Sequence, residues 1–168
     1  MRQWLTLANV LSGLRIMLSV ALLAPPALSP TFLAIYGTCG LTDMLDGLIA
    51  RWTKTESEFG AKLDSAADLT LTVVSLAKIL PTVVVPVWLW VWVTAIAFVK
   101  VVNAVSGLVM RKRLIMPHTI ANKAAGFVAF LVPFAIPTFG VVATSIPACA
   151  LATFAAAQEG HLIRTGQS

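Results

Sequence analysis

The chain has 168 residues, of which 58% are hydrophobic and only 11% are charged, and its mean hydropathy is +0.89. About a quarter of the residues of a soluble domain are charged, so this composition excludes an ordinary soluble enzyme and predicts a single transmembrane domain over residues 1–168. The net charge of +5 comes from basic residues that flank apolar segments. That placement indicates contact with the lipid bilayer and its headgroups, and no nucleic-acid partner is expected.

The predicted fold class is an all-α integral membrane protein with six transmembrane helices and a short interfacial helix before them. Residues 2–9 combine Arg2 and Trp4 with leucines, which is typical of a helix that lies on the membrane surface. Prolines or polar loops separate the apolar stretches that follow. The six expected membrane helices run over about Val10–Leu23, Phe32–Arg51, Gly60–Leu80, Val87–Met110, His118–Ala135 and Thr138–Ala157.

Charge divides the connecting segments into two sets. The links at about 24–31, 81–86 and 136–138 carry no charge. The N-terminus, the other two links and the polar tail Gln158–Ser168 carry nearly all of it. The positive-inside rule therefore predicts that both termini and the loop after Arg51 are cytoplasmic.

The two cysteines, Cys39 and Cys149, lie in apolar runs and match no metal or redox spacing. We expect both to be packing residues.

Four aspartates stand out between Asp43 and Asp68, a window that holds most of the chain's seven acidic residues. Asp43 and Asp46 share a face of the second expected helix, and Asp64 and Asp68 share a face of the third, because residues three or four apart are neighbours on a helix. At 1.5 Å per residue, Asp43 and Asp68 both lie about 12 Å in from the loop that joins these helices. We therefore expect the four carboxylates to form one cluster near the cytoplasmic surface.

Like charges this close do not all stay ionised without a cation, and all-oxygen ligands predict Mg²⁺ or Mn²⁺, as one ion or two. Gly47, Gly60 and, more weakly, Ala50 leave room for a bulky ligand, while Arg51 offers a planar guanidinium to phosphate. These features together predict a nucleotide-diphosphate site with metal-assisted chemistry. Small residues also serve helix packing and membrane carboxylates also form ion pathways, so a cation transporter remains an alternative.

The same residues resemble a known family. The window is similar to the signature D-x2-D-G-x2-A-R-x8-G-x3-D-x3-D of the CDP-alcohol phosphotransferases, also called CDP-alcohol phosphatidyltransferases. The stretch from Ala8 to Arg15 resembles that family's P-N-x-L-T-x-x-R segment, with Ala8 in place of Pro and Ser12 in place of Thr. The eight fixed positions of the signature are filled by Asp43, Asp46, Gly47, Ala50, Arg51, Gly60, Asp64 and Asp68.

The resemblance implies an enzyme of phospholipid biosynthesis in a prokaryotic cell membrane, acting as a homodimer. An alcohol would attack the β-phosphate of a CDP-alcohol, such as CDP-diacylglycerol, and release CMP. By this resemblance Asp43, Asp46 and Asp64 ligate metal, and Asp68 is the general base and also contributes to the metal site. The residues implied for the CDP part of the donor are Gly47, Ala50, Arg51, Ser57 and Gly60.

The acceptor alcohol is expected to bind near His118, Asn122 and Lys123 at the start of the fifth helix. Basic residues there favour a phosphorylated acceptor, such as glycerol 3-phosphate or another phosphorylated polyol. However, the segment from Asp64 to Leu69 lacks the Pro and Lys of the D-P-x-A-D-K form typical of glycerol-phosphate-using members. It looks closer to members that use serine or inositol phosphate, so serine remains an alternative acceptor.

Overall fold

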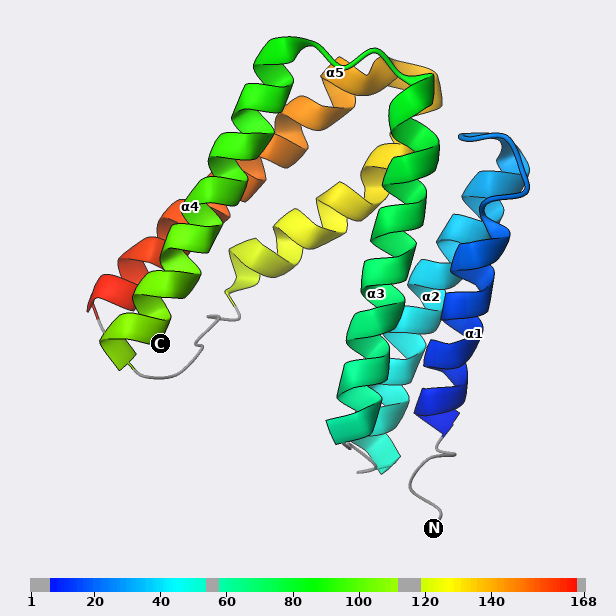
Figure 1. Cartoon of the computed structure of the whole chain (residues 1–168), viewed down its shortest axis with the longest axis horizontal. Helices are drawn as coiled ribbons and strands as arrows, with labels where there is room; N and C mark the ends of the chain where they lie inside the picture. The colour runs from blue at the N-terminus through cyan, green and yellow to red at the C-terminus, as the bar shows by residue number, and fades with distance from the viewer. Residues whose placement is uncertain (1–6, 54–57, 112–118, 166–168) are drawn as a thin grey trace. The chain divides into compact units, whose positions relative to one another are not determined.

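The computed structural model describes residues 7–53, 58–111 and 119–165, and all of the elements in these ranges are helices (Figure 1). The chain divides into two compact units, Met1–Val83 and Val84–Ser168. The elements are α1 (Leu7–Ala21), α2 (Pro30–Thr53), α3 (Glu58–Ile79), the short 3-10 helix η1 (Leu80–Thr82), α4 (Val87–Arg111) and α5 (Ile120–Thr165). The expected all-α class is confirmed over these residues.

The first four expected membrane helices correspond to α1–α4, with ends that differ by at most three residues. Local chemistry explains the start of α2, where Pro30 is the first helical residue and the Ser29 hydroxyl accepts a hydrogen bond from the Phe32 amide at 3.2 Å. Most of the expected interfacial helix, residues 2–6, lies outside the described residues, and residues 7–9 open α1.

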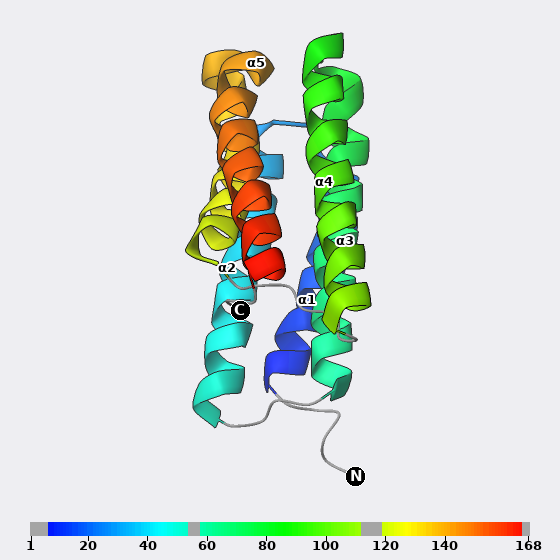
Figure 2. The same cartoon turned by 90° about the vertical axis from the view of Figure 1, so that its left-hand side faces the viewer.

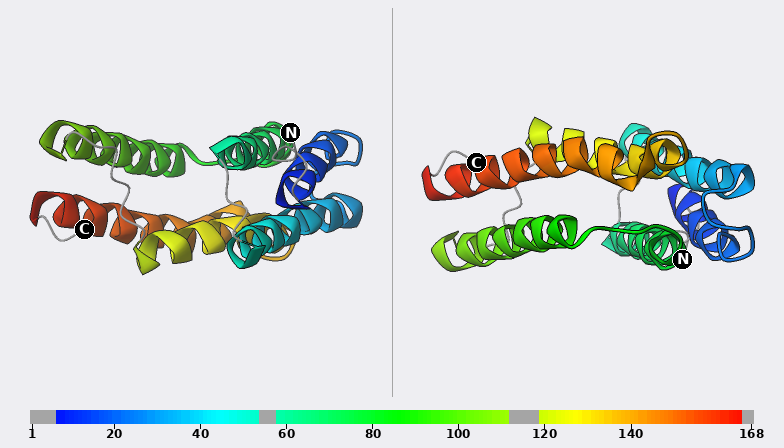
Figure 3. Two further views of the ribbon diagram at one scale, coloured as in Figure 1. Left: turned by 90° about the horizontal axis from the view of Figure 1, so that it is seen from below. Right: turned by 90° about the horizontal axis from the view of Figure 1, so that it is seen from above.

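In the first unit, α1 packs against both α2 and α3, and the three helices run side by side (Figure 2). The same grouping is visible end-on (Figure 3). Lys78, near the end of α3, donates to the Leu23 carbonyl at 2.9 Å. That carbonyl follows the last turn of α1, where backbone acceptors lack helical partners, so the long lysine side chain satisfies it.

The buried face of α1 is polar, whereas its exposed face is apolar. The buried polar residues of this helix are Asn9, Ser12, Arg15 and Ser19. The exposed large apolar residues are Val10, Leu14, Met17 and Val20. This pattern is the reverse of a water-soluble helix and fits one whose outer face meets lipid, while its small polar residues allow close approach to neighbouring helices.

In the second unit, α4 packs against α5 around Leu89, Ile96 and Cys149. Cys39, in the first unit, is likewise buried, and both cysteines are free thiols, as expected of packing residues. The Trp92 indole donates to the Thr153 hydroxyl at 3.0 Å and adds a polar tie between the two helices.

A sharp break at Gly140 divides α5, which folds back on itself at this point (Figure 1). Gly140 has φ 78° and ψ 165°, a backbone conformation that glycine adopts far more readily than other residues. The break expected at 136–138 is therefore wrong in position: Pro133 and Pro137 lie inside the helix and the chain turns just after them.

The last helical segment is also longer than expected. It continues through Thr165, so the tail expected after Ala157 is helical over most of its length. Glu159 and Ile163 are buried at 6% and 2% exposure, and this burial accounts for the continued helix.

Two helices among the described residues are long and apolar enough to cross a membrane, Val87–Leu108 with mean hydropathy 1.8 and Ile120–Thr165 with 2.1. A straight helix of the latter's 46 residues would be about 69 Å long, far more than the roughly 30 Å thickness of the hydrocarbon core. The break at Gly140 divides this length into two shorter helical segments. The count of six spans stays a prediction.

Candidate functional site

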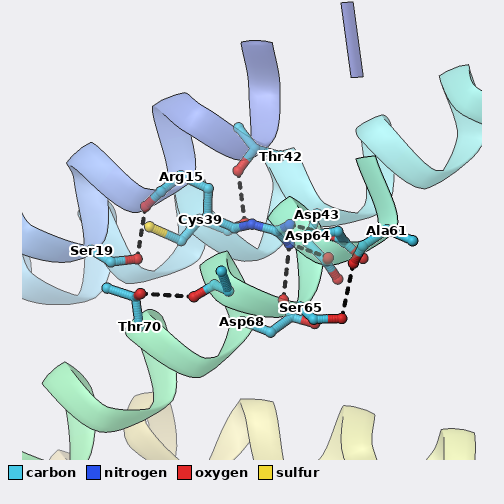
Figure 4. Close-up of polar contacts among 11 residues, drawn as sticks. Arg15, Ser19, Cys39, Thr42, Asp43, Ala61, Asp64, Ser65, Asp68 and Thr70 are labelled. Atoms are coloured by element: carbon cyan, nitrogen blue, oxygen red, sulfur yellow. Dashed lines mark hydrogen bonds and ion pairs between the residues drawn. The ribbon is translucent and has the colours of Figure 1, made fainter. Parts of the chain in front are cut away.

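Three of the four predicted aspartates meet in the first unit. Asp43 comes from α2, and Asp64 and Asp68 come from successive turns of α3. One carboxylate oxygen from each lies within 4.8 Å of the others (Figure 4). We call these three residues the carboxylate trio. The expected meeting of the carboxylates is thus confirmed for these three side chains.

Each member of the carboxylate trio remains open to its surroundings. The side chains of Asp43, Asp64 and Asp68 are 47%, 44% and 57% exposed. Asp68, the predicted base, is the most exposed of the three. The trio therefore presents its oxygen atoms on an accessible face of the unit.

Arg15 of α1 neutralises part of this charge from inside the bundle. Its side chain is 0% exposed, and its guanidinium donates hydrogen bonds to Asp43 and Asp64. Nη1 also lies 3.1 Å from Oδ1 of Asp68. Arg15 thus contacts all three carboxylates from the side opposite to their exposed face (Figure 4).

The motif from Ala8 to Arg15 predicts a supporting role for Arg15 without specifying it, and the partners of the residue were missed. The available signal was a lone charge in an otherwise apolar helix, where an ionised side chain needs a partner. Three of the four predicted aspartates are the partners it finds.

Several hydroxyl groups around the site donate to backbone carbonyls of their own helices. Ser19 donates to the Arg15 carbonyl at 2.7 Å, and Thr42 donates to the Cys39 carbonyl at 2.8 Å. On α3, Ser65 and Thr70 donate to carbonyls one turn earlier, at 2.9 and 2.7 Å. These hydroxyls are therefore engaged with the backbone, and the polar character of the site comes from the carboxylates and Arg15.

The carboxylate trio fits a small hard cation. Mg²⁺ holds oxygen ligands at about 2.1 Å in an octahedron, which places neighbouring ligand atoms about 3 Å apart and opposed ones about 4.2 Å apart. The trio already groups one oxygen from each residue within 4.8 Å, so a contraction of about 2 Å or less would let them share one ion. The all-oxygen donor set suits Mg²⁺ or Mn²⁺ rather than a thiolate-seeking metal.

The predicted donor-binding residues lie mostly where only the backbone is described. Gly47, Ala50 and Arg51 belong to the last turns of α2, as does the predicted metal ligand Asp46, and the side chains of these residues are outside the described set. Ser57 lies outside the described residues. Gly60 lies in the first turn of α3, one helical turn before Asp64.

A second polar cluster lies in the other unit and includes one predicted acceptor residue. Asn122 Oδ1 accepts from Lys100 Nζ at 3.0 Å, and Asn122 Nδ2 donates to Glu159 Oε2 at 3.3 Å. The Lys100 ammonium also lies 3.5 Å from the Glu159 carboxylate. We call these three residues the Glu159 cluster.

Glu159 was missed because it falls in the segment expected to be a polar tail. Of the other predicted acceptor residues, Lys123 is exposed in the first turns of α5, and His118 lies outside the described residues. The Thr119 hydroxyl caps this helix by accepting from the Asn122 amide at 3.1 Å, which holds Asn122 at the helix start.

Comparison with known proteins gives two matches. The model of a family described as CDP-alcohol phosphatidyltransferase matches residues 5–157. The chain is also 35% identical over 115 residues to a CDP-diacylglycerol–glycerol-3-phosphate 3-phosphatidyltransferase of Cereibacter sphaeroides, a match that covers 61% of this chain and 48% of the relative. The matched region therefore spans about half of that relative's length. No solved structure matches the chain.

Proposed function

Because this chain belongs to the CDP-alcohol phosphatidyltransferase family, we propose that it transfers a phosphatidyl group from CDP-diacylglycerol to the hydroxyl of a small polar alcohol and releases CMP. The observation that carries this proposal is the convergence of Asp43, Asp64 and Asp68 on one accessible face. Family membership favours this transfer over cation transport by the same carboxylates.

Asp68 is proposed as the general base. It is the most exposed member of the carboxylate trio, at 57%, so it is the one best placed to receive a substrate hydroxyl. Asp68 takes the proton from the acceptor hydroxyl, whose oxygen forms a bond to the β-phosphorus of the donor. The bond from that phosphorus to the oxygen of CMP breaks, and CMP leaves with the electron pair.

Asp43 and Asp64, with Asp46 from the next turn of α2, are proposed to hold the divalent cation, and Asp68 completes the set. A bound Mg²⁺ or Mn²⁺ supplies positive charge that stabilises the pyrophosphate and the leaving group. The CDP part of the donor is proposed to lie along the ends of α2 and α3, beside Gly47, Ala50, Arg51, Ser57 and Gly60.

Glycerol 3-phosphate is the proposed acceptor. The name of the Cereibacter sphaeroides relative supports it, as do the two basic residues, Lys123 and His118, among the predicted acceptor residues. Serine is the competing acceptor, because the Asp64–Asp68 segment lacks the proline typical of glycerol-phosphate-using members.

The protein is proposed to act in a prokaryotic cell membrane with both termini and the active site on the cytoplasmic side. The distribution of basic residues supports this orientation. A homodimer is proposed from family membership alone.

The test is CMP release by the purified full chain in detergent with CDP-diacylglycerol and one acceptor at a time, namely glycerol 3-phosphate, inositol 3-phosphate, serine or phosphatidylglycerol. We expect turnover with glycerol 3-phosphate, its loss on chelation with EDTA, and its return with added Mg²⁺ or Mn²⁺. Turnover with serine alone would show that serine is the acceptor and would leave the proposed transfer reaction unchanged. Manganese flux in proteoliposomes without CMP release from any acceptor would favour transport instead.

Asp68→Asn tests the base. The amide cannot take the proton at neutral pH, so we expect kcat to fall by about a hundredfold or more while the KM for the donor changes little. Thr70→Val is the matched control, because it removes a hydroxyl two residues away that bonds only a carbonyl of its own helix. Full turnover by the Asp68→Asn variant would contradict the assignment.

A further inference from the structure

Arg15 and its partners differ sharply in burial. The Arg15 side chain is 0% exposed, whereas the side chains of Asp43, Asp64 and Asp68 are each close to half exposed. The carboxylates can therefore be approached by a solute from the outer face, while the guanidinium is held behind them. A cation that reaches the carboxylate trio meets a positive charge already in contact with the same side chains.

The Arg15 side chain is enclosed within the first unit. Its helix packs against both α2 and α3, and the residues one turn before and after it on the same face, Ser12 and Ser19, are 3% and 0% exposed. Moving the guanidinium away from the carboxylates would leave a buried charge without its ionised partners, which is costly. The charge of Arg15 therefore stays beside the trio when another cation arrives.

We propose that Arg15 is a positioning residue that holds the carboxylate trio together in the metal-free protein and lowers its affinity for the divalent cation. This inference rests on the metal site proposed above. Without a cation, three carboxylates within 4.8 Å would repel one another, and the guanidinium offsets that repulsion. With a cation, the same positive charge competes for the carboxylates and weakens binding.

The competition is expected to be measurable. A single and a double positive charge about 6 Å apart in a medium as polar as water repel enough to weaken binding about tenfold, and a less polar setting increases the effect. Removing the charge of Arg15 should thus strengthen metal binding, although it removes hydrogen bonds that organise the site. A residue with a purely structural role would change affinity in the opposite direction.

The experiment measures Mn²⁺ affinity by electron paramagnetic resonance on the purified full chain in detergent, with no substrate present. We expect Arg15→Gln to bind Mn²⁺ at least about tenfold more tightly than the wild type. Arg15→Lys keeps the charge and should stay within about threefold of the wild type. Lys78→Gln removes the same charge about 15 Å along α3 from Asp68 and should leave the affinity unchanged.

Thermal unfolding provides the second measurement, and it tests the inference even if Arg15→Gln is less stable than the wild type. Metal-free Arg15→Gln should unfold at a lower temperature than the wild type, and saturating Mn²⁺ should narrow that gap, because the ion takes over the neutralisation of the trio. A gap that Mn²⁺ leaves unchanged or widens would contradict the inference.

The outcomes separate this inference from the proposed function. Wild-type Mn²⁺ binding that is lost in Asp64→Asn, together with unchanged or weaker binding in Arg15→Gln, overturns the role of Arg15 alone. A wild-type chain with no Asp64-dependent Mn²⁺ binding overturns the metal site and this inference with it.

Discussion

Replacing Glu159 with glutamine is expected to destabilise the second unit by about 1 kcal/mol. The Glu159 side chain is only 7% exposed, and its Oε2 accepts from Asn122 Nδ2 at 3.3 Å and lies 3.5 Å from Lys100 Nζ. Glutamine keeps the shape and an accepting oxygen, so the loss is the charge of the carboxylate. Both contacts are long and the Lys100 side chain is 41% exposed, so solvent screening keeps this loss well below the cost of breaking a fully buried ion pair.

A leucine at the same position removes the acceptor as well as the charge. Lys100 and Asn122 then both lose a partner, so Glu159→Leu should cost about 2–3 kcal/mol. Adding Lys100→Met to Glu159→Leu removes the stranded ammonium. We expect the double variant to be about 1 kcal/mol more stable than the sum of the two single changes predicts.

The assay is thermal unfolding of the purified chain in a non-ionic detergent. For a chain of this size 1 kcal/mol corresponds to about 2–4 °C, so Glu159→Gln should lower Tm by that amount. Lys123→Gln, which changes an exposed lysine on the same helix, should leave Tm nearly unchanged. A Glu159→Gln variant as stable as the wild type, or additive single and double variants, would refute the reasoning.

Three glycines of α5 provide further predictions with the same assay. A Cβ at Gly160 would lie 2.8 Å from Oδ1 of Asn103, a buried side chain already bonded to the Ala156 carbonyl, so Gly160→Ala should lower stability by about 1–3 kcal/mol. Gly126→Ala is the control, because nothing lies within 4 Å of the added Cβ and alanine favours the helix, so the Tm of this variant should stay the same or rise. An equal loss of Tm in Gly160→Ala and Gly126→Ala would rule out the clash with Asn103. Gly140→Ala should cost about 1–3 kcal/mol from backbone strain alone, because φ is 78° and nothing lies within 4 Å of the added Cβ; an unchanged Tm would show that the strain is absent.

The contacts that the sequence predicted best are those that depend on a single helix or on two helices joined by a short loop. Asp64 and Asp68 are four residues apart, so they share a face wherever α3 packs. Asp43 meets them because equal counts of residues on either side of the connecting loop place it at a similar depth. No knowledge of the rest of the chain is needed for either step.

The contacts that the sequence could not predict join residues far apart in the chain. Arg15 reaches Asp64 across 49 positions, and Glu159 reaches Lys100 across 59. Helical periodicity orients each residue on its own helix, and it does not say which other helix that face meets. Such pairings follow from tertiary packing, which the spacing of apolar residues alone does not specify in a chain that is apolar almost throughout.

The break in α5 was misplaced for a different reason. Prolines at 133 and 137 disfavour a helix, and a break was expected beside them. Neighbouring packing in a membrane helix tolerates proline, whereas a reversal of the chain needs backbone angles that only glycine adopts cheaply. The turn therefore forms at Gly140, the nearest glycine after both prolines.

The two polar clusters differ in their charge balance, and this difference indicates which of them is suited to bind a cation. In the Glu159 cluster, one ammonium faces one carboxylate and the amide of Asn122 is neutral, so the ionised groups cancel. In the first unit, the single positive charge of Arg15 faces three carboxylates, which leaves a charge of −2 among the described side chains. One divalent cation would neutralise this remaining charge of −2. The carboxylates that carry the negative charge are accessible, whereas Arg15 is buried. The imbalance thus favours a bound cation at the trio, whereas the ionised groups of the Glu159 cluster balance one another without a cation.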